Sequence, residues 1–334
     1  MGFKDLALFN DALLAKQAWR LLHNKDSLFH RVFKSKFLPD CSFMEALECA
    51  SGSYAWSSLL KGREVLWRGA HWRVGNGDSI KIWDHPWLPS LEHPRVLSPV
   101  IDGLHEATVN FLIKPTSRSW DRDTVAGFFA PLEADLILKI PLSATNVEDK
   151  LIWPHVPNGV YSVKSGYRFL VREKAIPRPS HQAQAQPPAS TLLPRPQRET
   201  PKWEPPPSLS LKINFDGAVF RDKGEAGLGM VVCDSHGRVI ASLVEKIQLP
   251  SSSDEVEALA AVQAITLAMD LNLPSFIVEG DSKVVISALR KEEESFSSFG
   301  HLIFSAKYYL HLCNCISFSH IRRSGNSVAH ALAK

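Results

Sequence analysis

The sequence is poor in cysteine, and the few cysteines present are scattered. The 334 residues include five, which are Cys41, Cys49, Cys233, Cys313 and Cys315. A secreted scaffold held by disulfides needs more cysteines in a shorter chain, so this class of fold is excluded. A structural zinc site has little support either, because no Cys-x-x-Cys pair occurs. The cysteine usage favours a reducing compartment. The sequence does not identify that compartment, and an intracellular protein, nuclear or cytoplasmic, is the open expectation.

Long hydrophobic stretches are also missing. No run of 18 apolar residues occurs, so we expect no membrane span. The stretch Met1–Leu6 lacks the apolar core of a signal peptide. With 45% hydrophobic and 22% charged residues, the composition is that of a globular protein, and the length is enough for two domains.

The sequence also lacks a strong net positive charge. The formal net charge is +3, and residues 208–334 contain 12 Lys and Arg against 14 Asp and Glu, a balance of −2. The rest of the chain therefore carries +5. Nucleic-acid contacts in the C-terminal part would have to be local, as at Arg322 and Arg323, or be supplied by the N-terminal part.

Proline is concentrated in one stretch. Residues 177–207 contain 10 of the 22 prolines, with Gln, Ala and Ser between them. Proline fixes φ and removes a hydrogen-bond donor, so neither a helix nor a sheet can continue through this stretch. The pattern predicts an N-terminal region over 1–174, a linker over 175–207 and a C-terminal domain over 208–334.

Apolar residues recur at helical spacing in the N-terminal region. The spacing predicts helices over 5–24, 27–37 and 53–69, whose aromatic residues we assign to core packing. Further along, Gly75-Asn76-Gly77-Asp78 lies between two short β-type runs, which favours a hairpin. A lone Gly-x-Gly of this kind is weak evidence for phosphate binding.

The C-terminal part alternates between strand and helix patterns. Strands are expected at about 210–217, 227–234, 238–248, 276–280 and 315–321, and helices at about 253–270, 282–291, 296–312 and from 326 onward. Ser252 or Ser253 is expected to cap the helix over 253–270, with Glu255 in its first turn.

Three acidic residues stand out at the ends of these elements. Asp216 ends the first strand, Glu257 lies on the first helix, and Asp281 follows the fourth strand. Reacting groups in α/β sheets collect beyond the carboxyl ends of strands. The three carboxylates could therefore form one cluster of hard oxygen ligands, which is how proteins hold Mg²⁺.

Five motifs in this order resemble the ribonuclease H type 1 family, specifically its plant reverse-transcriptase-like branch. They are Asn214-Phe215-Asp216-Gly217-Ala218, Ala226-Gly227-Leu228-Gly229-Met230-Val231-Val232, Glu257-Ala258-Leu259-Ala260-Ala261, Glu279-Gly280-Asp281-Ser282 and Gly325-Asn326-Ser327-Val328-Ala329-His330-Ala331-Leu332-Ala333. The resemblance implies an α/β fold, a ribonuclease H-like mixed five-stranded sheet flanked by helices, preceded by a mainly helical region with short strands. It also implies hydrolysis of the RNA strand of RNA–DNA hybrids with Mg²⁺.

The N-terminal region resembles the part of plant non-LTR retroelement proteins that lies downstream of the polymerase. The similar stretches are 72–89, 149–153 and 159–167. The Cys/His-rich segment that normally follows in those proteins is absent, and so are the paired aspartates of a polymerase. The region therefore resembles a fragment of a retroelement product joined to a ribonuclease H module.

The resemblance also assigns roles to the acidic residues. It makes Asp216 the carboxylate that bridges two metal ions, and Glu257 and Asp281 ligands on the leaving-group side. His330 stands where many members carry a fourth aspartate, and imidazole suits Mn²⁺ better than Mg²⁺. His320 stands near the place of a proton-transfer histidine, although its alternating strand equally fits an ordinary surface residue.

Contacts with nucleic acid are expected at five further positions, which are Gly217, Ser282, Arg322, Arg323 and Asn326. For Ser282, capping of the following helix is the favoured alternative. A hybrid would be recognised mainly by shape and by the 2′-hydroxyls in its shallow minor groove. We expect a monomer whose partner is an RNA–DNA hybrid or another nucleic acid.

Two other functions stay open at this point. The domain could be a catalytically weak or inactive nucleic-acid-binding module, because His330 replaces a carboxylate. Alternatively, the chain could be a protein-interaction remnant of the retroelement.

Overall fold

The computed structural model describes residues 5–39, 41–46, 53–175, 203–310 and 316–334. They form two compact units, Met1–His71 with Ile152–Pro196 and Trp72–Leu151 with Gln197–Lys334. The predicted linker lies mostly outside the described residues, so the boundaries at 174 and 208 stay predictions. Among the helices of the described stretches, none is both long and apolar enough to cross a membrane.

The first unit is helical, as predicted. It contains α1 (Leu6–His23), α2 (Leu28–Phe37), α3 (Tyr54–Gly69) and α6 (Val163–Ala175). The side chains of Asp5, Ser27 and Ser53 accept hydrogen bonds from the first turns of α1, α2 and α3, which fixes where these helices begin. The aromatic residues of this region pack as core, with Trp56 stacked on Phe37 at a centroid distance of 4.6 Å.

Short elements open the second unit. They are β1 (His71–Arg73), η1 (Val109–Leu112), β2 (Ile113–Lys114), β3 (Ser119–Trp120), α4 (Arg122–Phe128), α5 (Pro131–Leu138) and β4 (Lys150–Ile152). The β2 and β3 strands form an antiparallel hairpin, and the β1 and β4 strands pair with each other. Buried apolar side chains from 74–137 form a core of their own beneath these elements.

The hairpin predicted around Gly75-Asn76-Gly77-Asp78 is wrong. The β1 strand pairs with the distant β4, and the loop after it is gathered by the carboxylate of Asp149. This carboxylate accepts hydrogen bonds from the amides of Gly75 at 2.7 Å, Gly77 at 2.9 Å and Ser79 at 2.8 Å. The glycines allow the chain to curl around an internal anion, which also occupies the amides that a phosphate would need.

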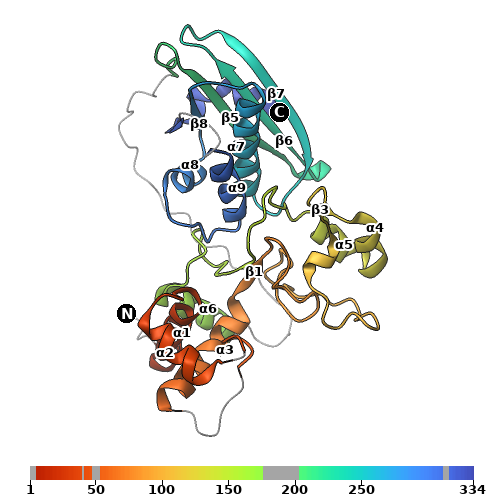
Figure 1. The fold of residues 1–334 in the computed structure, drawn as a ribbon, viewed down its shortest axis with the longest axis vertical. Helices are drawn as coiled ribbons and strands as arrows, with labels where there is room; N and C mark the ends of the chain where they lie inside the picture. The colour runs from red at the N-terminus through yellow and green to blue at the C-terminus, as the bar shows by residue number, and fades with distance from the viewer. Residues whose placement is uncertain (1–4, 40, 47–52, 176–202, 311–315) are drawn as a thin grey trace. The chain divides into compact units, whose positions relative to one another are not determined.

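The rest of the second unit is built on a five-stranded sheet with the order β7-β6-β5-β8-β9. Figure 1 labels β5, β6, β7 and β8 of this sheet. Its elements are β5 (Leu211–Phe220), η2 (Arg221–Lys223), β6 (Glu225–Cys233), β7 (Val239–Gln248), α7 (Ser253–Asp270), β8 (Phe276–Gly280), α8 (Lys283–Arg290), α9 (Gly300–Leu310), β9 (Ile316–His320), η3 (Arg323–Gly325) and α10 (Ser327–Ala333). Strands β5, β6 and β7 are antiparallel neighbours, whereas β5, β8 and β9 run parallel. This confirms the predicted mixed five-stranded sheet flanked by helices.

Helices cover both faces of the sheet. Ile213 and Phe215 point to the face covered by α7, α8 and α9, where a large apolar core forms. Figure 1 shows α7 lying along this face with α8 and α9 nearby. The α10 helix packs on the opposite face, against β5 and β6. Because side chains alternate along β5, Asp216 belongs to the α10 face.

Two differences from the sequence expectations concern element ends. The β5 strand continues past 217 to Phe220, because it stays paired with β6 as far as Glu225. The predicted helix over 296–312 begins only at Gly300, after a turn in which Gly300 N donates to Ser297 O at 3.0 Å.

Candidate active site

Asp216 lies where the central strand of the sheet loses one neighbour. The β5–β8 pairing ends at Phe215 and Gly280, while β5 remains paired with β6. Asp216 is the next residue along β5, and Asp281 is the next residue after β8. Since parallel strands end at the same edge, both carboxylates reach the same opening in the sheet. Asp216 is only 2% exposed, and its Oδ1 accepts a hydrogen bond from Gly217 N at 3.0 Å.

Glu257 reaches this opening from the second turn of α7. The start of the helix is fixed by a capping box, in which Ser252 and Glu255 each bond to the backbone of the other. Gly217 permits the close approach of α7 to β5, because a Cβ at this position would lie 2.7 Å from Cγ1 of Val256. A larger residue at 217 would push Glu257 away from Asp216.

The three predicted carboxylates meet in one cluster. One oxygen atom each from Asp216, Glu257 and Asp281 lie within 4.8 Å of one another. Burial, followed by repulsion from Asp216 and Asp281, raises the pKa of Glu257 to about 9. Burial and repulsion from Asp216 also raise the pKa of Asp281, against the opposing charges of Arg323, His330 and His320. The cluster thus has more negative charge than its surroundings compensate.

His330 contacts this cluster directly. Its Nδ1–H donates to Oδ2 of Asp216 at 2.6 Å, from the middle of the seven-residue helix α10. A guanidinium nitrogen of Arg323 lies 3.0 Å from Nε2 and 3.2 Å from Nδ1 of the same ring. The motif placed His330 near the carboxylates, but its contact with Asp216 and its pairing with Arg323 depend on how α10 crosses the sheet.

His320 lies at the other side of the opening. It ends β9 opposite Gly280, and its Nε2 donates to the main-chain oxygen of Asp281 at 3.1 Å. The side chain is exposed. The strand pattern alone left two roles open, and the structure places the imidazole beside the carboxylate cluster.

The remaining residues predicted to contact nucleic acid differ in their exposure and in their hydrogen bonds. Ser282 caps α8, since its Oγ accepts a hydrogen bond from Val285 N at 3.4 Å. Arg322 and Arg323 are exposed next to α10. Asn326 is 1% exposed, and its amide donates to Phe215 O at 2.8 Å. This burial speaks against the predicted contact of Asn326 with nucleic acid, because its amide is used inside the protein.

Sequence reasoning missed the buried polar network to which Asn326 belongs. Asn214 donates to Asn326 Oδ1 and to Glu279 Oε1, both at 3.1 Å, and accepts from Trp203 Nε1 at 2.9 Å. Lys212 lies 3.4 Å from Glu279. The signal in the sequence was the polar half of the β5 alternation, Lys212-x-Asn214-x-Asp216. The network fixes the start of α10 on β5, and therefore the place of His330.

Comparisons with known proteins match the C-terminal part of the chain and segments before it. Residues 214–334 match the family described as "Reverse transcriptase-like". The chain is 28% identical over 189 residues to a protein of Arabidopsis thaliana named "Putative ribonuclease H protein", a match that covers 54% of this chain and 30% of that protein. It is 42% identical over 88 residues to an uncharacterized mitochondrial protein of the same plant, covering 26% of this chain and 57% of that protein.

The chain therefore spans less than two thirds of either Arabidopsis relative. Among solved structures, the crystal structure of ribonuclease H1 from the halophilic archaeon Halobacterium salinarum is similar, with 24% sequence identity and a TM-score of 0.34, covering 37% of this chain and 94% of that one. The family match confirms the resemblance to the reverse-transcriptase-like branch that the five motifs indicated.

Proposed function

We propose that the C-terminal domain is a metal-dependent endonuclease that hydrolyses the RNA strand of RNA–DNA hybrids. The observation that carries this proposal is the meeting of Asp216, Glu257 and Asp281 within 4.8 Å. Like charges held this close cost stability unless a cation or a proton compensates them. Their positions at the open edge of a ribonuclease H-like sheet agree with the roles that the resemblance assigns.

A divalent cation fits the residues present. Oε2 of Glu257 is buried and has no hydrogen-bond partner within the described residues. Such an atom is costly unless a ligand satisfies it. Carboxylate oxygens are the donors that Mg²⁺ prefers, and Mn²⁺ accepts them as well. Asp216, Glu257 and Asp281 would hold the ion, which when bound activates water and offsets the charge of the reacting phosphate.

Other groups near the three carboxylates orient Asp216, stand ready for proton transfer or offer charge to the nucleic acid. Gly217 N and His330 hold the two oxygens of Asp216, so this carboxylate has a fixed direction. His320 is exposed beside Asp281, to whose main-chain oxygen its Nε2 donates, and it stands near the place where the resemblance expects a proton-transfer histidine. Arg322 and Arg323 offer exposed positive charge for phosphates, and the RNA strand is selected by its 2′-hydroxyls.

The second candidate function is hybrid binding with weak or no cleavage. The contact between His330 and Asp216 favours it, because the imidazole occupies an oxygen that an ion could otherwise use. His330 also contributes no negative charge where a fourth carboxylate would. Binding needs the surface and the shape of the domain, whereas cleavage needs the complete set of ligands.

The deciding experiment is cleavage of a labelled RNA–DNA hybrid by the full chain, in Mg²⁺ and separately in Mn²⁺. Glu257→Gln removes one proposed ligand, and Glu293→Gln removes an exposed carboxylate elsewhere as a matched control. We expect cleavage by the wild type and by Glu293→Gln, and none by Glu257→Gln. Salt-sensitive hybrid binding without cleavage in either metal would select the second function. Cleavage that persists in Glu257→Gln would contradict the assignment of the site.

A further inference from the structure

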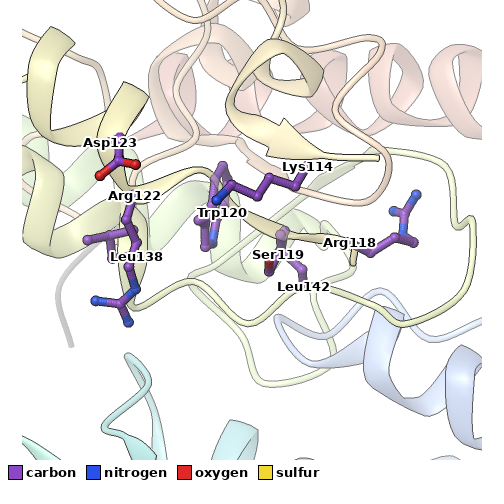
Figure 2. Close-up of a pocket in the computed structure, with 8 residues that line it drawn as sticks. All are labelled: Lys114, Arg118, Ser119, Trp120, Arg122, Asp123, Leu138 and Leu142. Atoms are coloured by element: carbon purple, nitrogen blue, oxygen red, sulfur yellow. The ribbon is translucent and has the colours of Figure 1, made fainter. Parts of the chain in front are cut away.

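A hollow away from the carboxylate cluster lies between the β2–β3 hairpin and helices α4 and α5. Its volume is about 500 Å³. Figure 2 shows its lining residues, which are Lys114, Arg118, Ser119, Trp120, Arg122, Asp123, Leu138 and Leu142. Three of these residues are cationic and one is anionic, so the lining carries a local surplus of positive charge.

The hairpin that carries two of the cations is held firmly. Arg118 has a φ of 46°, a left-handed conformation that is uncommon for a residue with a side chain. Its guanidinium donates to Ser143 O at 3.1 Å and to Gly75 O at 3.2 Å, and these two hydrogen bonds offset the cost of the left-handed backbone. The turn is thereby fixed, and the hollow exists before any ligand arrives.

The two cations besides Arg118 are available to a ligand. Lys114 is exposed, and its ammonium lies 3.6 Å from Asp121 in a loose ion pair. Arg122 is exposed at the start of α4. Figure 2 shows the basic side chains spread around Trp120 and Ser119, and they do not converge on one point. A single phosphate would need converging donors, whereas the successive phosphates of a strand can meet charges that are spread out.

The aromatic residue in the floor is not a stacking platform for bases. Trp120 is 8% exposed, its Nε1 donates to Ile140 O at 2.8 Å, and its ring packs against Trp87. Recognition in this hollow must therefore come from charge and shape, without reading of the sequence of bases.

The C-terminal part of the second unit lacks the positive charge that a nucleic acid would need. Residues 208–334 have a net charge of −2, and their carboxylate cluster repels a polyanion. The segment with the hollow is attached to this domain by buried contacts, since Arg73 donates to Ser295 O and Ser297 O, both at 2.8 Å. The hollow therefore supplies positive charge within the same compact unit.

We propose that this hollow binds the phosphate backbone of a nucleic-acid strand and that Lys114 and Arg122 are the contact groups. This inference rests on the proposed function, because the hollow would give the proposed nuclease an accessory contact with nucleic acid outside its catalytic domain. Each neutralised phosphate adds about 0.7–0.9 to the slope of log affinity against log salt concentration.

The test measures the anisotropy of a labelled hybrid in metal-free buffer over a range of salt concentrations, with the full chain. Lys114→Ala/Arg122→Ala should lower the salt slope by about 1.4–1.8 and weaken binding at 0.1 M salt by about 25–60-fold. Lys81→Ala/Arg238→Ala removes two charges outside the hollow, where they pair with Glu106 and Asp234, and should leave both values unchanged. Unchanged melting temperatures would show that the variants fold.

An unchanged salt slope in Lys114→Ala/Arg122→Ala, or an equal loss in the control pair, would overturn the inference. Its failure differs from that of the proposed function. If the hybrid is cleaved but its binding does not depend on the hollow, only the accessory contact is refuted. If the hybrid is never cleaved but the double variant binds it more weakly, only the nuclease activity is refuted and the accessory contact is supported.

Discussion

Nδ1 of His330 lies 2.6 Å from Oδ2 of Asp216, so an imidazole closes the side of the cluster where the resemblance leads one to expect a fourth carboxylate. A histidine bonded to a buried carboxylate orients it and, when protonated, offsets its charge. It cannot contribute a negative oxygen for a cation. If the domain uses a divalent cation as proposed, the concentration it needs should depend on how tightly Asp216 and His330 hold each other.

Asp216→Asn should abolish hybrid cleavage and leave the fold intact. The change keeps the size of the side chain and removes the charge at the centre of the cluster. Because repulsion from Asp216 contributes to the raised pKa of Glu257, the metal-free protein should melt at the same or a higher temperature. Asp222→Asn, on the exposed turn after β5, is the matched control and should retain activity. Normal cleavage by Asp216→Asn would refute the role of this carboxylate.

His330→Asp should lower the Mg²⁺ concentration needed for cleavage and raise the rate. It replaces the imidazole with the carboxylate that the cluster lacks, and a tenfold gain corresponds to about 1.4 kcal/mol of transition-state stabilisation. Added repulsion should also destabilise the metal-free protein, so Mg²⁺ should raise its melting temperature more than that of the wild type. If the variant needs as much Mg²⁺ as the wild type and cleaves no faster, His330 is a competent substitute.

Gly217→Ala should reduce both stability and cleavage. A Cβ here meets Cγ1 of Val256 at 2.7 Å, which would force α7 and Glu257 away from Asp216. Overpacking of this kind costs about 1–3 kcal/mol. Adding Val256→Ala removes the clashing atom and should restore part of the activity. Gly127→Ala meets no atom within 4 Å and serves as the control for thermal unfolding. Full activity in Gly217→Ala would show that α7 does not need this close approach.

His301 should make the second unit sensitive to acid. Burial, together with the charge of Arg73, lowers its pKa to about 3 from an ordinary 6.5, and its Nε2 donates to Pro141 O at 2.8 Å. The unfolded chain takes up a proton below pH 6.5 and the folded chain only near 3. The stability contribution is therefore present above pH 6.5 and is lost as the pH falls toward 3.

Urea unfolding at pH 7 and pH 5 tests the role of His301. At pH 7, His301→Gln should be less stable than the wild type, and this gap should narrow by about 2 kcal/mol at pH 5. His93→Gln, at an exposed position, should follow the wild type at both values. An equal gap at the two pH values would show that His301 does not titrate as its burial predicts.

Limited proteolysis should release a C-terminal fragment that begins before Trp203. The proline-rich composition of 177–207 predicts the first cuts in that stretch, on the N-terminal side of Trp203. The indole of Trp203 donates to Asn214 Oδ1 at 2.9 Å and packs beside Ala329, so cuts should not reach past it. Mass spectrometry of the fragment gives its first residue. First cuts within 211–320 would contradict the proposed domain boundary.

The sequence by itself was sufficient to predict the order of strands and helices in the C-terminal domain and the acidic cluster that they position. Alternation along 211–216 and the cap at Ser252 are local patterns, and local chemistry fixes where a strand runs and where a helix begins. The order of Asp216, Glu257 and Asp281 along these elements then predicted the cluster, because parallel strands end at one edge. Helices in the first unit could be predicted for the same reason.

What only the tertiary structure decided are contacts between residues far apart in the chain. The loop at Gly75 is shaped by Asp149, a distant carboxylate, so local turn chemistry suggested the wrong hairpin. Asn326 is buried because it completes a network with Asn214, and His330 meets Asp216 because α10 crosses that strand. Such pairings depend on how elements pack in three dimensions, and no local pattern in the sequence records that packing.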